Sequence, residues 1–265
     1  MITRNNISDF IDKIPPSPKI LQETIRYLNN GDLNKAAKTA TEDPALSAFL
    51  KNLVNKPLYG FKQEVSDISQ IFGILGLSGS QQSVYNYMLT LLSPKKWNLF
   101  HLNEISFDEL QAVFSIQWQH ILEHLKIVDK DIESSITLLP ASIIVSEALF
   151  SKSKEDVELL RSVHDLNYNT ILQRLCDTTL FDICVEISLK WDMPQVIPDI
   201  VRCASGINPS KEKDINKLGK WMHLLLFYEL SQPLFVEAGL NDFIEFNIDY
   251  VEDIYEEFLE VMGVQ

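Results

Sequence analysis

Apolar residues recur every three or four positions along most of the chain, and turn-forming residues separate these repeats. Side chains three and four positions apart lie on the same side of a helix, so this spacing is typical of helices that bury one face. No stretch alternates apolar and polar residues over a useful strand length, and no repeat or low-complexity tract occurs. The pattern predicts an all-α fold, a compact globule of many short helices.

The first third of the chain predicts a group of short helices with clear start and stop signals. After an extended entry through residues 15–18, Gly31 can end the first helix and Asp32 can cap the second. Asp43 followed by Pro44 is a strong start for the third, because proline is favoured at the first helical position. Ser66 is expected to start a helix that ends at Gly76, and Ser78 with Gln81 resembles a capping box that opens residues 84–92.

The segment Ser93-Pro94-Lys95-Lys96 interrupts the helical pattern and is the best candidate for a boundary. We therefore expect an N-terminal helical subdomain at 1–92, a helical core at 93–206 and acidic C-terminal helices at 207–265. Ser106 with Glu109 is a second possible capping box, which opens a long helix to about Val128. Further helices are expected from about Pro140 and Ser153, and near residues 169–176, 179–191, 194–204, 214–230 and 250–262.

The net charge of −14 is concentrated at the C-terminal end. From Trp221 to Gln265 there are ten acidic residues and no Lys or Arg, whereas the rest of the chain has 27 acidic and 23 basic residues. Such a surface repels phosphate backbones, which argues against nucleic-acid binding. The acids are expected on a solvated helix face. A mixed apolar stripe in this region could dock on the core or meet a partner helix; it comprises Phe243, Phe246, Tyr250, Ile254, Phe258 and Val261.

The cysteines and the apolar runs indicate a cytoplasmic protein. Cys176, Cys184 and Cys203 are odd in number and lack metal-like spacing, which is typical of free thiols in a reducing compartment. The N-terminus has no apolar signal-peptide core, and the longest charge-free run, Ile68–Pro94, is interrupted by the polar stretch SGSQQS. We therefore expect neither secretion nor membrane insertion.

Three phrases near the N-terminus resemble the signature of the HDOD (HD-related output domain) family. They read IPPSPKILQETIRYL, TEDPALSAFLKNLVNKPLYGF and ISQIFGILGL, and they lie between Ile14 and Leu77. The resemblance extends to about Gly206 and is strongest before Leu92. It implies an HD-domain-like helical fold and a role in bacterial signal transduction. It also implies kinship with HD phosphohydrolases, in which a divalent metal held by His and Asp activates water against a phosphate ester.

In this chain the positions that would hold such a metal carry other residues. His120, in QWQHILEH, matches the first His of the pattern, but no His lies between His124 and His164. The His-Asp pair is replaced by Ser146 and Glu147, or in an alternative register by Pro140 and Ala141. A later Asp-His pair is replaced by Thr179 and Leu180, and a His cluster by Arg202, Cys203, Ala204 and Ser205. Several ligands are missing from different helices, which predicts no metal, no cofactor and no enzymatic activity.

Two alternatives stay open at this level. A displaced metal site would need ligands to converge from His120, His124, Glu147, His164 or Asp165. His164-Asp165 is the only literal HD dipeptide, but it lies outside the expected helix. A second alternative is an old pocket that binds a nucleotide without hydrolysing it. Neither a glycine-rich phosphate loop nor a nucleophile elbow is present to support it.

The most recognisable family segment is NKPLYGF, residues 55–61. One interpretation is structural: the asparagine ends a helix, the glycine permits a turn and the aromatic residues pack between helices. The competing role is a recognition patch for a protein partner. The residues in question are Asn55, Pro57, Tyr59, Gly60 and Phe61. The leading hypothesis is a non-catalytic regulatory module that acts through protein–protein contact, with a partner that the sequence does not name.

Overall fold

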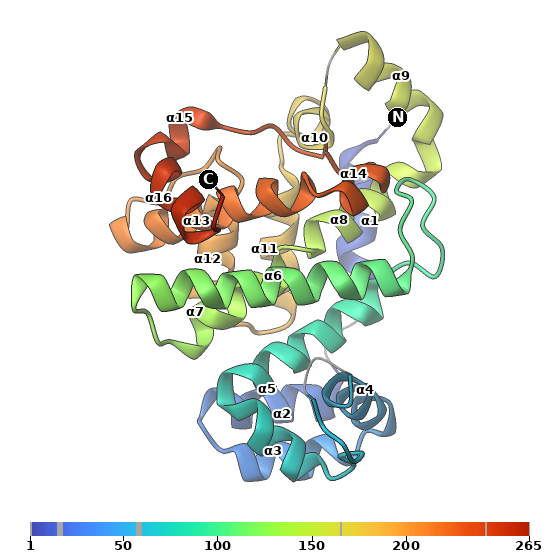
Figure 1. The fold of residues 1–265 in the computed structure, drawn as a ribbon. Helices are drawn as coiled ribbons and strands as arrows, with labels where there is room; N and C mark the ends of the chain where they lie inside the picture. Colours follow the sequence, from blue (N-terminus) through green and yellow to red (C-terminus); the bar gives the residue numbers. More distant parts are fainter. Residues whose placement is uncertain (1, 15–17, 57–59, 165, 242, 265) are drawn as a thin grey trace.

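Every regular element in the described part of the chain is a helix (Figure 1). The computed structural model describes residues 2–14, 18–56, 60–164, 166–241 and 243–264, and it confirms the all-α prediction. In chain order the helices are α1 (Arg4–Lys13), α2 (Lys19–Asn29), α3 (Leu33–Ala40), α4 (Pro44–Val54), α5 (Ile68–Leu92), α6 (Glu104–Leu125), α7 (Lys130–Ser134), η2 (Ser135–Leu138), α8 (Ala141–Phe150), η3 (Ser151–Ser153), α9 (Lys154–His164), α10 (Tyr168–Cys176), α11 (Leu180–Lys190), α12 (Val196–Cys203), α13 (Lys213–Leu230), α14 (Pro233–Glu237), α15 (Ile248–Val251), η4 (Glu252–Ile254) and α16 (Tyr255–Val261), where η marks a 3₁₀ helix.

The start signals of the N-terminal helices behave as predicted. The Asp32 carboxylate accepts a hydrogen bond from the Lys35 N–H at 3.0 Å and caps α3. The Asp43 carboxylate accepts bonds from two N–H groups of α4, which begins at Pro44. These caps satisfy backbone donors that a helix leaves free at its first turn. Of the expected extended entry, residues 15–17 lie outside the described residues.

Helix α5 begins at a different cap from the one predicted, and it is broken at Gly76, where a helix end was expected. Asp67, not Ser66, is the N-cap, because its carboxylate accepts a hydrogen bond from the Gln70 N–H. Gly76 kinks the helix with φ 67° and ψ −173°, a conformation that favours glycine, but the helical path continues beyond it to Leu92. The expected capping box at Ser78 is wrong, since the Gln81 side chain forms other contacts.

Buried Gln81 links three helices instead. Its amide nitrogen donates to Asn29 of α2 and Asp131 of α7, both at 2.9 Å. Its carbonyl oxygen accepts a hydrogen bond from the Ser134 hydroxyl of α7. A buried amide with both ends satisfied fixes the relative position of the elements it joins. Gln81 therefore ties α2 and α5 to α7, in the body of the molecule.

Helix α6 also begins at a different cap from the one predicted, three residues earlier in the chain. Asn103 is its N-cap and forms a reciprocal capping box with Ser106, so Ser106 is the partner of the cap and not the cap itself. The helix ends at Leu125, because Lys126 adopts the left-handed conformation with φ 58°. Val128, which the pattern placed on this helix, lies beyond its end and is 94% exposed.

The short elements α1, α7 and α14 were not predicted. Helix α1 buries one residue, Ile7, and α7 and α14 have only five residues each. Such segments have too few apolar positions to produce a visible 3.6-residue period. Their ends are nevertheless well defined, since the Asp129 carboxylate accepts bonds from two N–H groups at the start of α7.

Figure 1 shows how the helices are arranged around α5 and α6. Helices α2, α3 and α4 gather with the first part of α5 at one end, and α5 rises from this group toward α6. Helices α6 and α13 pack together, and α8, α11 and α12 lie in the larger body. Helix α1 packs on α8 and α11, away from its sequence neighbours α2 to α4. One apolar core runs through both parts.

The C-terminal stripe docks on this core in a different way from the one predicted. Phe243 and Phe246 lie outside any helix, so a single helical stripe is wrong. Phe243 packs edge-on against Phe100, and Phe258 of α16 contacts Trp221. The acidic residues of η4 and α16 face solvent. These contacts use most of the apolar surface that the stripe could have offered to a partner helix.

One stretch, Lys130–His164, is apolar and long enough by composition to cross a membrane. Within its most apolar window, 89% of the residues are buried inside the fold. The stretch is divided among α7, η2, α8, η3 and α9. Its burial favours the role of a core segment.

Candidate functional site

Glu147, which one register of the sequence places at a metal-ligand position of the HD pattern, forms structural contacts instead. It lies on α8, is 2% exposed, and its carboxylate accepts hydrogen bonds from three consecutive backbone N–H groups. The donors are Asn98 at 2.8 Å, Leu99 at 2.9 Å and Phe100 at 3.3 Å. A buried carboxylate needs such donors to offset its lost hydration. The carboxylate is therefore engaged in holding the loop before α6.

The other replaced positions are also occupied by local structure. Ser146 is fully buried, and its hydroxyl has no partner among the described residues. Thr179 caps α11 by accepting a hydrogen bond from the Asp182 N–H, and its own N–H and hydroxyl donate to the Asp182 carboxylate. Leu180 is buried, and its N–H donates to the Asn169 side chain at 2.9 Å. In the alternative register, Pro140 is the N-cap of α8 and Ala141 its first residue.

The end of α12 faces the start of α11, where a second group of ligands would be needed. Arg202 forms an ion pair with Asp182 at 3.0 Å. Burial raises the pKa of the Cys203 thiol, which disfavours the thiolate that a metal requires. The Ala204 carbonyl accepts a hydrogen bond from His223, and the Ser205 hydroxyl accepts one from the Ile207 N–H. These residues do not fit a metal centre.

The histidines of the displaced-site hypothesis do not converge in the described part of the chain. His120 is exposed on α6, and His124 forms an ion pair with Glu257 at 2.8 Å when protonated. His164 is exposed on α9, and Asp165 lies outside the described residues. Among the described residues, no group of three His, Cys, Asp or Glu side chains could hold a metal ion.

His223 is a buried histidine that sequence reasoning missed. Its Nδ1–H donates to the Ala204 carbonyl at 2.8 Å, and its Nε2 accepts from the Asn247 N–H at 3.1 Å. Burial lowers the pKa of His223 to about 4. Asn247 in turn donates its side-chain amide to the Gly206 carbonyl. His223 thus ties the C-terminal segment to the end of α12, and no local motif marks it in the sequence.

The family segment at residues 55–61 is partly structural. Asn55 ends α4, and its side-chain amide donates to the Lys51 and Val65 carbonyls while its oxygen accepts from the Val65 N–H. Gly60 has φ 67°, as a turn requires. Phe61 is 45% exposed, which corrects the expectation that it packs between helices. Pro57 and Tyr59 lie outside the described residues, and a partner-binding role of the segment stays a prediction.

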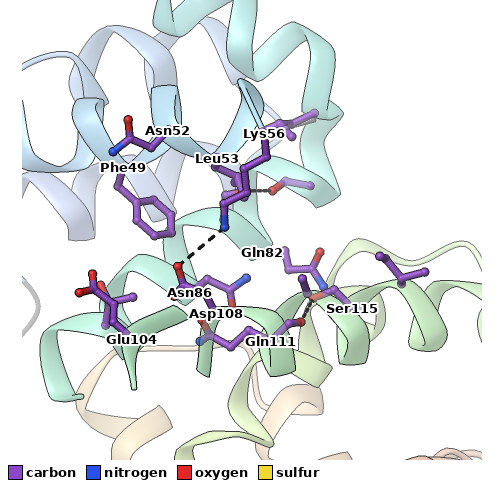
Figure 2. A pocket seen from close by; sticks show the side chains of 16 residues that line it. Phe49, Asn52, Leu53, Lys56, Gln82, Asn86, Glu104, Asp108, Gln111 and Ser115 are labelled. Carbon is purple, nitrogen blue, oxygen red and sulfur yellow. Dashed lines mark hydrogen bonds and ion pairs between the residues drawn. The ribbon is translucent and has the colours of Figure 1, made fainter. Parts of the chain in front are cut away.

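A groove of about 270 Å³ lies between the α4 segment, α5 and α6 (Figure 2). Its apolar part comes from Phe49, Leu53, Leu75 and Ile116. Lys56 reaches across it from the end of α4 to Asp108 of α6, with 3.7 Å between the ammonium nitrogen and the carboxylate oxygen. Burial raises the pKa of Asp108 despite this lysine. The groove is continuous with a hollow of about 560 Å³ that shares Thr90, Glu104 and Asp108.

Four carboxamide side chains line this groove, and none was singled out from the sequence. They are Asn52, Gln82, Asn86 and Gln111. Gln111 is 5% exposed, and its amide nitrogen has no hydrogen-bond partner among the described residues. The signal in the sequence is weak, because polar residues at helical spacing also occur on ordinary solvated faces.

Comparison with known proteins identifies the fold. The HDOD domain model matches residues 14–206, and no curated protein matches the chain. An HDOD domain protein of unknown function from Geobacter sulfurreducens is 15% identical, with a TM-score of 0.65, over 98% of this chain and 95% of that one. A Shewanella amazonensis SB2B protein, provisionally named a phosphohydrolase, is 13% identical, with a TM-score of 0.67, over 98% of both chains.

A third structure connects the fold to signalling by name. It is a Marinobacter aquaeolei VT8 protein, provisionally named for signal transduction, which is 15% identical with a TM-score of 0.64. The alignment covers 98% of this chain and 64% of that one. At such identities the likeness shows a shared fold and leaves the chemistry to each site. Because the HDOD model matches residues 14–206, well over half of the chain, this protein belongs to the HDOD family.

Proposed function

We propose that this HDOD protein is a non-catalytic regulatory module of signal transduction that acts in the cytoplasm through contact with a protein partner. In this proposal it binds no nucleic acid, inserts into no membrane and uses no metal or cofactor. The family supplies the signalling context, and a protein named for signal transduction shares the fold. The acidic surface, with a net charge of −14, supports a protein partner over a nucleic acid.

The engagement of Glu147 is the observation that carries the non-catalytic part. A catalytic carboxylate must be free to hold a metal or move a proton. The Glu147 carboxylate instead accepts three backbone N–H groups in a buried site. Thr179 and Arg202 meet on Asp182, so the neighbouring positions are likewise engaged in structure.

The direct test measures metal and hydrolysis in the same purified protein. We expect substoichiometric Mn, Fe, Mg and Zn by mass spectrometry after dialysis against metal-free buffer. We also expect no hydrolysis of p-nitrophenyl phosphate or bis(p-nitrophenyl) phosphate above the buffer rate with added Mn²⁺ or Mg²⁺. Stoichiometric metal, or turnover that the Glu147→Gln substitution removes, would overturn the proposal. A thermal shift with nucleotides or cyclic dinucleotides would favour a nucleotide sensor instead.

A further inference from the structure

The groove between the α4 segment, α5 and α6 has polar groups that the fold itself does not use. The side chains of Asn52, Gln82, Asn86 and Gln111 form no hydrogen bond with another described residue. For the exposed Asn52 this is ordinary, because water can satisfy it. For Gln111, with 5% exposure, it is unusual, because buried amides are nearly always paired. Gln111 lines the groove, so a ligand that brings an acceptor into the groove could satisfy this buried, unpaired donor after a small side-chain shift.

Two of the carboxamides, Gln82 and Asn86, lie four residues apart along α5, and Thr90 follows four residues later. Between Ser80 and Thr90 every residue is buried except Gln82, Asn86 and Thr90, which are partly exposed and line the groove. Residues four apart on a helix repeat about every 6 Å along its axis. In an extended chain, peptide groups that face the same way repeat about every 6.6 to 6.8 Å. A row of side chains on α5 therefore has nearly the spacing of the peptide groups of an extended segment laid beside it.

A carboxamide has the same donor and acceptor pair as a peptide group. One such side chain can accept from a backbone N–H and donate to a backbone C=O. A helical ligand would not use these groups, because its backbone hydrogen bonds are internal. An extended segment has free N–H and C=O groups and needs partners for them. Figure 2 shows Lys56 reaching from the α4 side of the groove toward Asp108 of α6, with Asn52 beside Phe49 on the same side as Lys56.

The remaining lining indicates an apolar anchor and little dependence on charge. Phe49, Leu53 and Leu75 are partly buried and offer a place for one apolar side chain. Lys56 lies near Asp108 and Glu104, and the adjoining hollow adds Lys95 and Lys96. Three basic and two acidic side chains nearly cancel. A phosphate-bearing ligand would meet Asp108 beside Lys56, so this lining does not favour a nucleotide.

From these observations we propose that the groove binds an extended, largely uncharged peptide segment of a partner protein, with backbone recognition by the carboxamides and one apolar side chain against Phe49 and Leu53. This inference rests on the proposed role in protein–protein contact and assigns that role a surface. It places the binding groups away from the replaced metal positions on α8, α11 and α12. The two sets can therefore be tested by separate variants.

The test uses the full chain and a defined probe. A library of N-acetylated, C-amidated hexapeptides is passed over the immobilised protein, and retained peptides are identified by mass spectrometry. The dissociation constant of the best peptide is then measured for the wild type and for Gln111→Leu. We expect the substitution to weaken binding about tenfold, the size of one lost hydrogen bond in a dry site. Binding should change little between 50 and 500 mM NaCl, since exposed charge pairs are what salt screens.

A matched control lies on the same helix. Gln119 is exposed on α6 outside the groove, so Gln119→Leu should leave the affinity within about twofold, as surface substitutions usually do. Asn86→Leu, at a partly exposed position, provides a second groove variant that keeps the fold if Gln111→Leu does not. Three results would each overturn the inference. The first is that no peptide is retained above a denatured-protein control, and the second is that both groove variants bind the peptide as tightly as the wild type. The third is that the protein binds nucleotides and Gln111→Leu abolishes that binding.

Failure of this inference and failure of the proposed function give different results. If no peptide binds but the protein also lacks metal and hydrolytic activity, only the groove assignment falls. If the protein hydrolyses phosphate esters and Glu147→Gln stops it, the non-catalytic function falls whatever the groove binds. The hydrolysis measurement therefore has to be made on the same preparation as the peptide measurement.

Discussion

The replaced metal region and the α4–α5–α6 groove use similar polar side chains in opposite ways. Around α8, α11 and α12 most polar groups are engaged, with the buried Ser146 hydroxyl as an exception: Glu147 accepts three N–H groups, Asn169 accepts the Leu180 N–H, and Asn247 donates to the Gly206 carbonyl. In the groove, Gln82 and the buried Gln111 have no such partner among the described residues. Most polar groups of the first region are paired within the fold, whereas those of the groove are left for a ligand.

This difference indicates where a binding site can be sought if the protein has no catalytic site. When ligands disappear from a metal centre, the remaining buried polar groups must find new partners or be replaced, because an unpaired buried group is costly. The Glu147 carboxylate is paired with backbone N–H groups of the loop at residues 98–100. An unpaired group that persists, such as Gln111, is not explained by folding alone. Ser146 is also unpaired but lies in the core of α8, whereas Gln111 lines the groove, so Gln111 is the one of the two that a molecule in the groove can meet.

The largest expected effect comes from removing the Glu147 carboxylate. Glu147→Ala leaves three N–H groups without their acceptor, two of them on buried residues, so the free energy of unfolding should fall by about 3–5 kcal/mol. Urea denaturation at pH 7 measures it. Glu186→Ala is the matched control, because Glu186 is exposed on neighbouring α11 and its loss should stay within about 0.5 kcal/mol. Equal stability of the two variants would break the comparison.

The second effect is a pH dependence from His223. Its folded pKa of about 4 lies below the ordinary value of 6.5, so the unfolded chain takes up a proton first as the pH falls. His223 therefore contributes stability above pH 6.5 that is lost toward pH 4, about 2 kcal/mol of it by pH 5. The groups around it are the Ala204 carbonyl, the Asn247 N–H and the rings of Phe227, Phe246 and Tyr250.

The buried Glu229 carboxyl changes stability with pH in the opposite direction, so it is replaced before the effect of His223 is measured. Burial raises its pKa to about 7, so its contribution is present below pH 4.5 and is lost as the pH rises through 7. In the Glu229→Gln protein we expect stability to fall from pH 7 to pH 5. Adding His223→Gln should remove about 2 kcal/mol of that fall, as measured by urea denaturation at both pH values. An identical pH profile for both proteins would show that His223 is not held neutral by the core.

The sequence predicted this closed region better in outline than in detail. Helix positions followed from periodicity, and the caps at Asp32 and Asp43 followed from local chemistry. The absence of a metal site remains a prediction from the residue types. What the sequence could not show was the new partner of Glu147, because the N–H donors lie 47 to 49 residues away. Long-range contacts of this kind leave no periodic signal.

The groove was harder still to predict. Its lining comes from three helices, and each helix contributes polar residues that look like a solvated face when read alone. The role of Gln81 was also ambiguous in the sequence. The pattern suggested that it caps a helix, but its side chain joins α2, α5 and α7. Only the packing distinguishes a polar side chain that holds the fold from one that faces a cavity.

A third test compares two helical glycines, Gly219 of α13, which packs against α12, and Gly73 of α5, which lies outside the groove lining. At Gly219, between α13 and α12, an added Cβ would lie 2.3 Å from the Cys203 Cβ, so Gly219→Ala should destabilise the protein by about 1–3 kcal/mol. At Gly73 on α5 nothing lies within 4 Å of such an atom. Gly73→Ala should stabilise the helix by up to about 1 kcal/mol through its better helix propensity. Opposite signs in thermal denaturation would confirm close packing between α12 and α13 and open space beside Gly73. The comparison weakens if both changes are neutral.

The smallest effect is expected at the Lys56–Asp108 pair. Both side chains are partly exposed and 3.7 Å apart, so Lys56→Met should change the free energy of unfolding by less than about 0.5 kcal/mol. Because Lys56 lowers a pKa that burial raises, its removal should move the Asp108 pKa further upward, which carboxyl NMR titration can follow. A large loss of stability with no pKa change would mean that Lys56 holds the fold as Glu147 does, and would erase the contrast between the two regions. A small loss with a higher pKa would leave Lys56 as a side chain positioned for what the groove receives.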